Sequence, residues 1–272
     1  VRGVNMVEVS DSNDVAIFPY EGEIVVHQNR DFTFDGIVQT GDFALYGKQM
    51  KFRYNPFEIE LNKIDSLQYT ISTGFVNQEA EQVNETVKTV ISDITGTLYV
   101  DGPKNKSGLD NQPDFPKLHS YEEAHIYYDK IKKGVYKREL FSFKTDPFQF
   151  DSLLSINTES IEFTGRLNAP TIFPSFIDTM RLNESLQLSL SHKISNRYPA
   201  YEGRGEFTND LYLDNNGLRG SGAIYYLNSL TVTDSIYFYP YRALAHAKTH
   251  HIYEQESPTS SPEAYVENAS ID

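Results

Sequence analysis

The sequence predicts an all-β protein with an antiparallel jellyroll, sandwich-like or irregular elongated β-structure, and at most one short helix near residues 121–133. Two observations carry this prediction. Aromatic residues make up 13% of the chain, as 19 tyrosines and 17 phenylalanines without tryptophan, and they occur in short runs with valine, isoleucine and threonine, a composition typical of strands. Many of these runs alternate apolar and polar residues and are separated by turn signals.

The clearest alternation is SLQLSLSHKI, in which Leu186, Leu188, Leu190 and Ile194 share one face and polar residues occupy the other. A period of two predicts a strand with one buried face. In chain order, similar runs are GEIVVHQ, DFTFDGIV, MKFRY, FEIEL, ITGTLYV, GVYKRELFSF, DLYL, GAIYYL and DSIYFYPY. The turn signals between them include Asn55-Pro56, Asp101-Gly102-Pro103, Asp146-Pro147 and Asn216-Gly217.

Two β segments are expected, at 1–103 and 117–272, although they could equally be one continuous domain of a longer chain. Between them, residues 104–116 are rich in Asn, Asp, Gly and Pro, which indicates a loop or a boundary. Immediately afterwards, Ser120 precedes Glu123 with capping-box spacing, so a short helix ending at Gly134 is possible. The run HIYYD fits a strand equally well, and both alternatives stay open.

The net charge of the chain limits the kinds of partner that it can bind. The chain has 24 Lys and Arg against 38 Asp and Glu, a formal net charge of −14, and no compensating basic block. Nucleic acid and anionic membrane surfaces are therefore not expected as partners. No run approaches the roughly 18 apolar residues of a membrane span. The first ten residues lack the regions of a signal peptide, and we expect a processed protein or a piece of a longer one.

The absence of cysteine excludes disulfides, thiolate zinc sites and cysteine nucleophiles. No Gly-x-Ser-x-Gly elbow is present, and a glycosidase pair cannot be chosen among so many acidic residues. No catalytic residue and no cofactor are therefore assigned.

The most motif-like stretch is DNNGLRGSGAIYYL, which contains Gly217, Gly220 and Gly222. A phosphate loop requires glycines that lead into a helix, whereas this run leads into a β-branched and aromatic segment. We interpret Asn216-Gly217 as a hairpin turn, with Gly220 and Gly222 on one face where another backbone approaches. The stretch predicts two antiparallel strands without a phosphate between them.

A weak candidate for a metal site is formed by His246, His250, His251 and Glu254. On a strand, His246 and His250 share a face but lie about 13 Å apart, too far to bind one metal. A solvated strand or loop is the simpler interpretation.

Four Asp-[Ser/Thr]-apolar triplets resemble the O-glycosylation triplet of exported Bacteroidota proteins, and the acceptors would be Ser66, Ser152, Thr179 and Ser235. The same dipeptides also suit the turn that precedes a strand, so both interpretations stay open.

Several segments occur in a characteristic order, among them TGTLYVDGPKNKSG, GVYKRELFSFKTDPFQFDSL, IEFTGRL and NNGLRGSGAIYYLNSLTVTDSIYFYP. Over most of residues 94–245 the chain resembles the middle of very large exported β-rich proteins of Bacteroidota, a family with no assigned catalytic residues. The rhythm of TDSIYFYPYRALAHA is weakly similar to the β-jellyroll repeats of organic-solvent-tolerance and lipopolysaccharide-transport proteins. That resemblance implies a β-jellyroll and a role in lipid transport.

The leading hypothesis is a non-enzymatic, extracytoplasmic β-scaffold or interaction segment of a large cell-envelope protein, in the periplasm or at the cell surface. Its partners would be other segments of the same chain or envelope proteins, with no membrane span. The first alternative is an elongated β-groove that carries lipid or another apolar ligand. The second alternative is a carbohydrate-binding or carbohydrate-active module.

Overall fold

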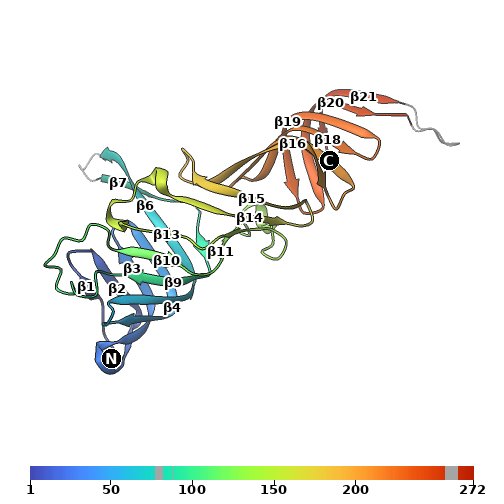
Figure 1. Cartoon of the computed structure of the whole chain (residues 1–272). Helices are drawn as coiled ribbons and strands as arrows, with labels where there is room; N and C mark the ends of the chain where they lie inside the picture. Colours follow the sequence, from blue (N-terminus) through green and yellow to red (C-terminus); the bar gives the residue numbers. More distant parts are fainter. Residues whose placement is uncertain (77–81, 88, 255–262) are drawn as a thin grey trace. The chain divides into compact units, whose positions relative to one another are not determined.

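The computed structural model describes residues 1–76, 82–87, 89–254 and 263–272 (Figure 1). Over these residues the chain forms 21 strands and four short 3-10 helices, and every strand pair with an assigned register is antiparallel. The all-β prediction is therefore confirmed. Among the described residues, no helix has the length and apolar character that crossing a bilayer requires.

The chain divides into two compact units that interleave in sequence. The first comprises Val1–Ile126, Lys144–Phe163 and Glu184–Gln187. The second comprises Tyr127–Phe143, Thr164–Asn183 and Leu188–Asp272. The loop at 104–116, expected as a possible boundary, lies inside the first unit.

The first unit is a set of antiparallel strands around one apolar core. Its strands are β1 (Val7–Ser10), β2 (Val15–Val26), β3 (Phe32–Thr40), β4 (Phe43–Arg53), β5 (Glu58–Ile64), β6 (Ser66–Val76), β7 (Gln82–Thr86), β8 (Ile91–Ser92), β9 (Ile94–Tyr99), β10 (Lys117–Ser120) and β13 (Gln149–Phe150). Successive pairing joins β2, β3 and β4, and β5 pairs with β9. Each of these five strands contributes a fully buried apolar side chain to the core: Ile17, Val38, Leu45, Ile59 and Leu98.

Three strands contain residues of both units, namely β11 (Ala124–Tyr127), β12 (Ser142–Thr145) and β14 (Glu162–Ala169). The first of them settles the open choice between helix and strand after Ser120. Ser120 donates its hydroxyl to the carbonyl oxygen of Glu122 at 2.9 Å instead of capping a helix. The residues that follow form a strand, and the helical content nearby is one 3-10 turn at Lys132–Gly134. The remaining 3-10 helices are Gln28–Arg30, Leu153–Ser155 and Thr158–Ser160.

The second unit is built around an antiparallel meander in which each strand pairs with the next along the chain (Figure 1). Its strands are β15 (Phe173–Leu182), β16 (Leu188–Ala200), β17 (Gly205–Asp214), β18 (Gly217–Tyr226), β19 (Ser229–Tyr239), β20 (Arg242–Ile252) and β21 (Ala264–Ile271). Neighbouring pairs place Phe207, Ile224, Thr231 and His250 in one row across the sheet. We call the face that carries this row the inner face and the opposite one the outer face.

Aromatic side chains fill the inner face over β17 and β19. The ring of Phe238 lies 4.9 Å from that of Phe173 and 5.1 Å from that of Phe207, and all three are buried. Nearby, the buried hydroxyl of Tyr136 donates to the carbonyl oxygen of Phe238 at 2.7 Å and accepts from the N–H of Leu218 at 3.2 Å. This part of the sheet is therefore a closed core.

Candidate functional site

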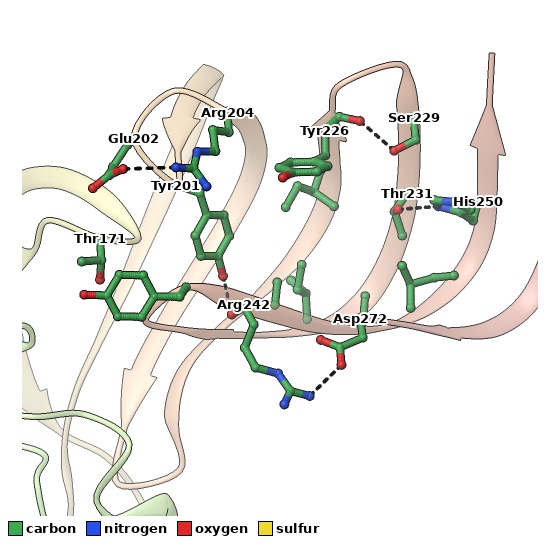
Figure 2. Close-up of a pocket in the computed structure, with 16 residues that line it drawn as sticks. Thr171, Tyr201, Glu202, Arg204, Tyr226, Ser229, Thr231, Arg242, His250 and Asp272 are labelled. Carbon is green, nitrogen blue, oxygen red and sulfur yellow. Dashed lines mark hydrogen bonds and ion pairs between the residues drawn. The ribbon is translucent and has the colours of Figure 1, made fainter. Parts of the chain in front are cut away.

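A groove of about 580 Å³ lies on the inner face of β18–β21 in the second unit (Figure 2). Half of its lining residues are aliphatic or aromatic: Tyr201, Ile224, Tyr226, Ile236, Tyr241, Ala243, Ala245 and Ile271. The other half are polar or charged: Thr171, Glu202, Arg204, Ser229, Thr231, Arg242, His250 and Asp272. Small-molecule sites in proteins are typically apolar concavities of about 300–1,000 Å³ with a few polar groups that fix orientation. The groove has the size of that class, and its aliphatic and aromatic residues give it an apolar portion beside its polar groups.

Small side chains on β20 leave the groove open. Ala243 and Ala245 lie on the inner face of this strand and line the groove, where β19 next to it carries Ile236 and Phe238. Ala243 lies directly opposite Phe238, at the limit of the aromatic core. An alanine side chain consists of one carbon. The alanines of β20 therefore leave space unfilled on the inner face of the sheet. The same face thus changes from a packed core to a groove across one strand pair.

Tyrosines form the walls of the groove. The hydroxyl of Tyr201, in the turn after β16, donates to the carbonyl oxygen of Arg242 at 2.6 Å. Burial raises the pKa of Tyr201 far above its ordinary value, so its hydroxyl stays protonated and remains a donor. Tyr226 and Tyr241 add rings on β18 and in the β19–β20 turn. The aromatic rings make the sides of the groove apolar, and each ring ends in a polar hydroxyl group.

The charges at the rim of the groove are paired. Arg242 lies 2.9 Å from the Asp272 carboxylate, and Arg204 lies 3.9 Å from Glu202 (Figure 2). Exposed pairs of this kind contribute little to stability, but they leave the rim without a strong field of either sign. On the floor of the groove, Thr231 Oγ1 and His250 Nδ1 share a hydrogen bond of 2.8 Å. This pair is one polar feature that can orient a ligand against the apolar floor, and the hydroxyl groups of Thr171 and Ser229 also line the groove.

The glycine run lies at the hairpin between β17 and β18. Asp214 pairs with Gly217, so Asn215 and Asn216 are the two loop residues, and Gly217, with φ of +95°, begins the outgoing strand. The Asp214 carboxylate accepts a 2.7 Å hydrogen bond from the N–H of Asn216, as expected of an Asx turn. The turn lies one residue earlier than Asn216-Gly217.

Two further glycines of this run lie on β18 against close neighbours. A side chain at Gly220 would meet the rings of Phe207 and Phe238, and one at Gly222, with φ of +148°, would meet the carbonyl oxygen of Thr208 on β17. These glycines thus permit close packing within the second unit.

The structure does not bring the four metal candidates together. His246 is exposed on the outer face of β20, whereas His250 faces the groove. His251 bonds to Glu263, and Glu254 follows the strand at an exposed position. Over the described part of the chain, no three His, Asp or Glu side chains are placed to hold one metal ion.

The four glycosylation candidates differ in accessibility. Ser235 is exposed on β19, while Ser66 and Ser152 are half-buried at the start of β6 and before a 3-10 turn. Thr179 is half-buried on β15, and its hydroxyl lies 2.9 Å from that of Thr164. Ser235 is therefore the most accessible of the four.

No family model, curated protein or solved structure matches this chain. The functional argument therefore rests on the side chains and their geometry. The alternating alanines at 243–247 and the turn tyrosines Tyr201 and Tyr241 are the sequence signals that could have indicated the groove. Tyr241 and the alanines lie in TDSIYFYPYRALAHA, the run whose resemblance to lipopolysaccharide-transport repeats implies a lipid role, but that resemblance assigns no residue to a groove.

Proposed function

We propose that this chain is a non-enzymatic β-scaffold whose second unit carries an apolar ligand, the acyl chain of a lipid, in the groove on β18–β21. The observation that carries the proposal is the groove itself, with an aliphatic floor of Ile236, Ala245 and Ile271 and tyrosine walls. A long apolar chain on this floor removes apolar surface from water on both partners, which favours binding by roughly 25 cal/mol for each Å² buried. The geometry thus favours the lipid alternative over a purely structural role.

The paired rim charges support a ligand whose buried part is uncharged. A free carboxylate or phosphate on the floor would require an unpaired cation nearby, because burying an unpaired charge is costly. The groove instead offers the Thr231–His250 pair, which suits a neutral hydroxyl, ester or amide group. The charged end of a lipid would remain in water at the rim.

Native mass spectrometry of the chain, purified without detergent from a bacterial host, tests this function. The proposal expects a bound population heavier by the mass of a lipid, which organic extraction identifies. Refolded, delipidated protein should regain the same mass after incubation with a total lipid extract. Apo masses alone, both before and after this incubation, would contradict the proposal.

An interaction role is a second candidate, and the observation that favours it is the exposure of β21. Every residue from Ala264 to Asn268 is exposed, including the apolar side chains of Tyr265 and Val266. An exposed strand offers backbone N–H and C=O groups to a further strand, from another segment of the same chain or from an envelope protein. Sedimentation velocity of the chain and of Val266→Lys, alone and with neighbouring segments, tests this role. The lysine should abolish association, and association that survives it would contradict a role for β21.

The extracytoplasmic location is part of the same proposal and is supported by the resemblance to exported Bacteroidota proteins. Labelling of intact native cells with a membrane-impermeant amine reagent tests it. Modification of exposed lysines such as Lys248 before lysis supports the location, and modification only after lysis of both membranes contradicts it.

A further inference from the structure

A second concavity, the outer hollow, has a volume of about 570 Å³ and lies on β15–β18 of the second unit. It is bordered by Asp178, Ser189, Ser191, Tyr212, Asp214 and Arg219. Ser191, Tyr212 and Arg219 occupy one row across three strands, whereas the neighbouring inner-face row contains Leu211 and Gly220. The outer hollow and the groove share no lining residue, so they are separate sites.

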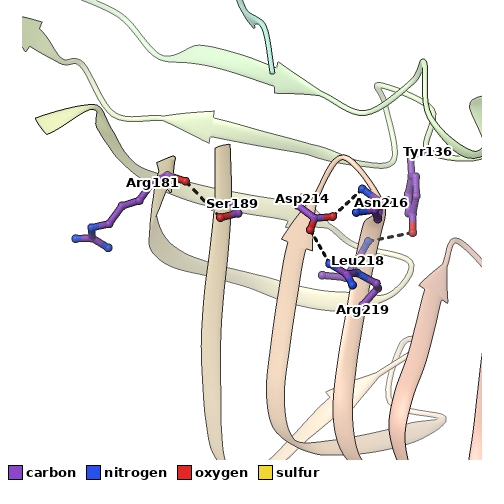
Figure 3. Close-up of polar contacts among 7 residues, drawn as sticks. All are labelled: Tyr136, Arg181, Ser189, Asp214, Asn216, Leu218 and Arg219. Atoms are coloured by element: carbon purple, nitrogen blue, oxygen red, sulfur yellow. Dashed lines mark hydrogen bonds and ion pairs between the residues drawn. The ribbon is translucent and has the colours of Figure 1, made fainter. Parts of the chain in front are cut away.

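Two carboxylates of the outer hollow are held in fixed orientations. Asp214 accepts hydrogen bonds from the N–H of Asn216 at 2.7 Å and from Arg219 Nη2 at 2.6 Å (Figure 3). Asp178 accepts from the N–H of Thr179 at 2.7 Å and contacts His192 Nδ1 at 2.8 Å. Each carboxylate oxygen can accept more than one hydrogen bond, so both residues keep acceptor capacity in a fixed geometry.

Arg219 supplies donors next to these acceptors. A guanidinium has five N–H donors, and the hydrogen bond to Asp214 uses one of them. The Nε–H is buried and makes no hydrogen bond to any described residue. The side chain as a whole is partly exposed, so the donors that a ligand can reach are the remaining Nη N–H groups. The hydroxyl groups of Ser189 and Ser191 can both donate and accept. Figure 3 shows Ser189 beside the Asp214–Arg219 pair, while the guanidinium of Arg181 points away from it.

The electrostatics of the outer hollow favour a neutral ligand. Two carboxylates, Asp178 and Asp214, and two guanidinium groups, Arg181 and Arg219, line the outer hollow, and Arg219 is paired with Asp214. The whole chain has a net charge of −14. The formal charges of these four groups cancel, so an anion finds no excess positive charge in the outer hollow, and the net negative charge of the chain opposes its approach. A dense mixture of fixed donors and acceptors without excess charge instead matches hydroxyl groups, which donate and accept at once.

Tyr212 adds a flat apolar surface to this polar site. It is 38% exposed and takes part in none of the ring contacts of the described residues. Fixed carboxylates, a guanidinium, hydroxyl groups and an exposed ring together match the two kinds of surface on a pyranose, its hydroxyl edge and its C–H face. We propose that the outer hollow binds a neutral oligosaccharide, with Tyr212 packed against one sugar ring and Asp178, Asp214 and Arg219 bonded to its hydroxyl groups.

Isothermal titration of the whole chain with cellohexaose, maltohexaose, xylohexaose and mannohexaose tests this proposal, and inorganic phosphate is the anionic comparison. At least one oligosaccharide should bind. Tyr212→Ala and Arg219→Gln should each weaken its binding about tenfold or more, while Tyr212→Phe should retain it. Tyr265→Ala, which removes an exposed tyrosine from β21, is the matched control and should bind like the unmodified chain.

Three results would overturn the oligosaccharide site: no binding by any of the four sugars, equal binding by all variants, or binding of phosphate alone. Circular dichroism of each variant separates a binding loss from unfolding. The proposal does not depend on the lipid function. Tyr212→Ala should leave fatty-acid binding unchanged, so the two proposals fail separately.

Discussion

The phenol of Tyr201 donates a 2.6 Å hydrogen bond to the carbonyl oxygen of Arg242, and this bond joins the turn after β16 to the first residue of β20. The two residues are 41 positions apart and both line the groove (Figure 2). One wall of the groove is thereby fixed to its floor. The apolar site therefore depends on a contact between turns as well as on the strands themselves.

Replacing Tyr201 with phenylalanine should lower the free energy of unfolding by about 1 kcal/mol, because the carbonyl of Arg242 loses its donor while the ring remains. Urea unfolding followed by circular dichroism measures the change. Tyr241→Phe is the matched control, since Tyr241 is 73% exposed and should change little. Equal losses for the two variants would contradict a specific role for the Tyr201 bond.

Three phenols, two of them fully buried and that of Tyr201 half-buried, predict alkaline destabilisation of the second unit. Burial raises the pKa of Tyr128, Tyr136 and Tyr201 well above 10.0, so these groups remain protonated in the folded chain. In the unfolded chain they ionise near pH 10. The unfolded state then binds fewer protons, so stability is complete below that pH and falls above it, by about 1.4 kcal/mol per pH unit for each phenol.

Stability measured between pH 9 and pH 11.5 checks this sign. Tyr128→Phe should reduce the slope above pH 10 by one phenol's share, since Tyr128 has only a long 3.7 Å contact to Met180 Sδ to lose. An exposed residue without a titratable group gives the control, because Ile177→Ala should leave the slope unchanged. A flat profile to pH 11.5 would show that these phenols ionise in the folded state.

The glycines of the β17–β18 hairpin predict a steric effect at one position. Gly222→Ala combines a φ of +148° with a clash against the carbonyl oxygen of Thr208, so it should cost about 3 kcal/mol. Gly203→Ala is the matched control: its φ is +82°, but nothing lies within 4 Å of the added carbon. It should cost about 1 kcal/mol. Similar costs at both positions would mean that β18 relaxes away from Thr208.

If the Asp-Ser/Thr triplets are modified in the native host, Ser235 should carry the glycan first, because it is the most exposed of the four acceptors. Peptide mapping of chain purified from that host measures the occupancy of each site. Ser235→Ala should remove the corresponding mass, whereas Thr179→Ala should not. A glycan on Thr179 with Ser235 bare would contradict the ranking by exposure.

Local patterns in the sequence predicted the strands well. In FEIEL, Phe57, Ile59 and Leu61 are all buried, as the period of two requires. In SLQLSLSHKI, Leu188, Leu190 and Ile194 are buried on β16. Leu186 is the exception, because its φ of +55° places it in the turn before the strand. Alternation identifies the buried face, but it does not reveal where the strand begins.

The groove and the outer hollow could not be predicted in the same way, because both depend on register across several strands. Ala245 lines the groove only because it is aligned with Ile236 on β19 and with Ile271 on β21. Arg219 meets Asp214 because the hairpin pairs Asp214 with Gly217. Long-range register of this kind is set by packing and by bulges such as the one between Thr233 and Ser235, which no local pattern predicts.

Titration of the delipidated chain with palmitate, compared between Ala245→Phe and His246→Phe, tests the lipid function most directly. Both substitutions place a phenyl ring on adjacent residues of β20, but Ala245 faces the groove and His246 lies exposed on the outer face. The groove account predicts saturable binding of palmitate that Ala245→Phe weakens about tenfold or more and His246→Phe leaves unchanged. Equal binding by the two variants, or no saturable binding by the unmodified chain, would contradict it.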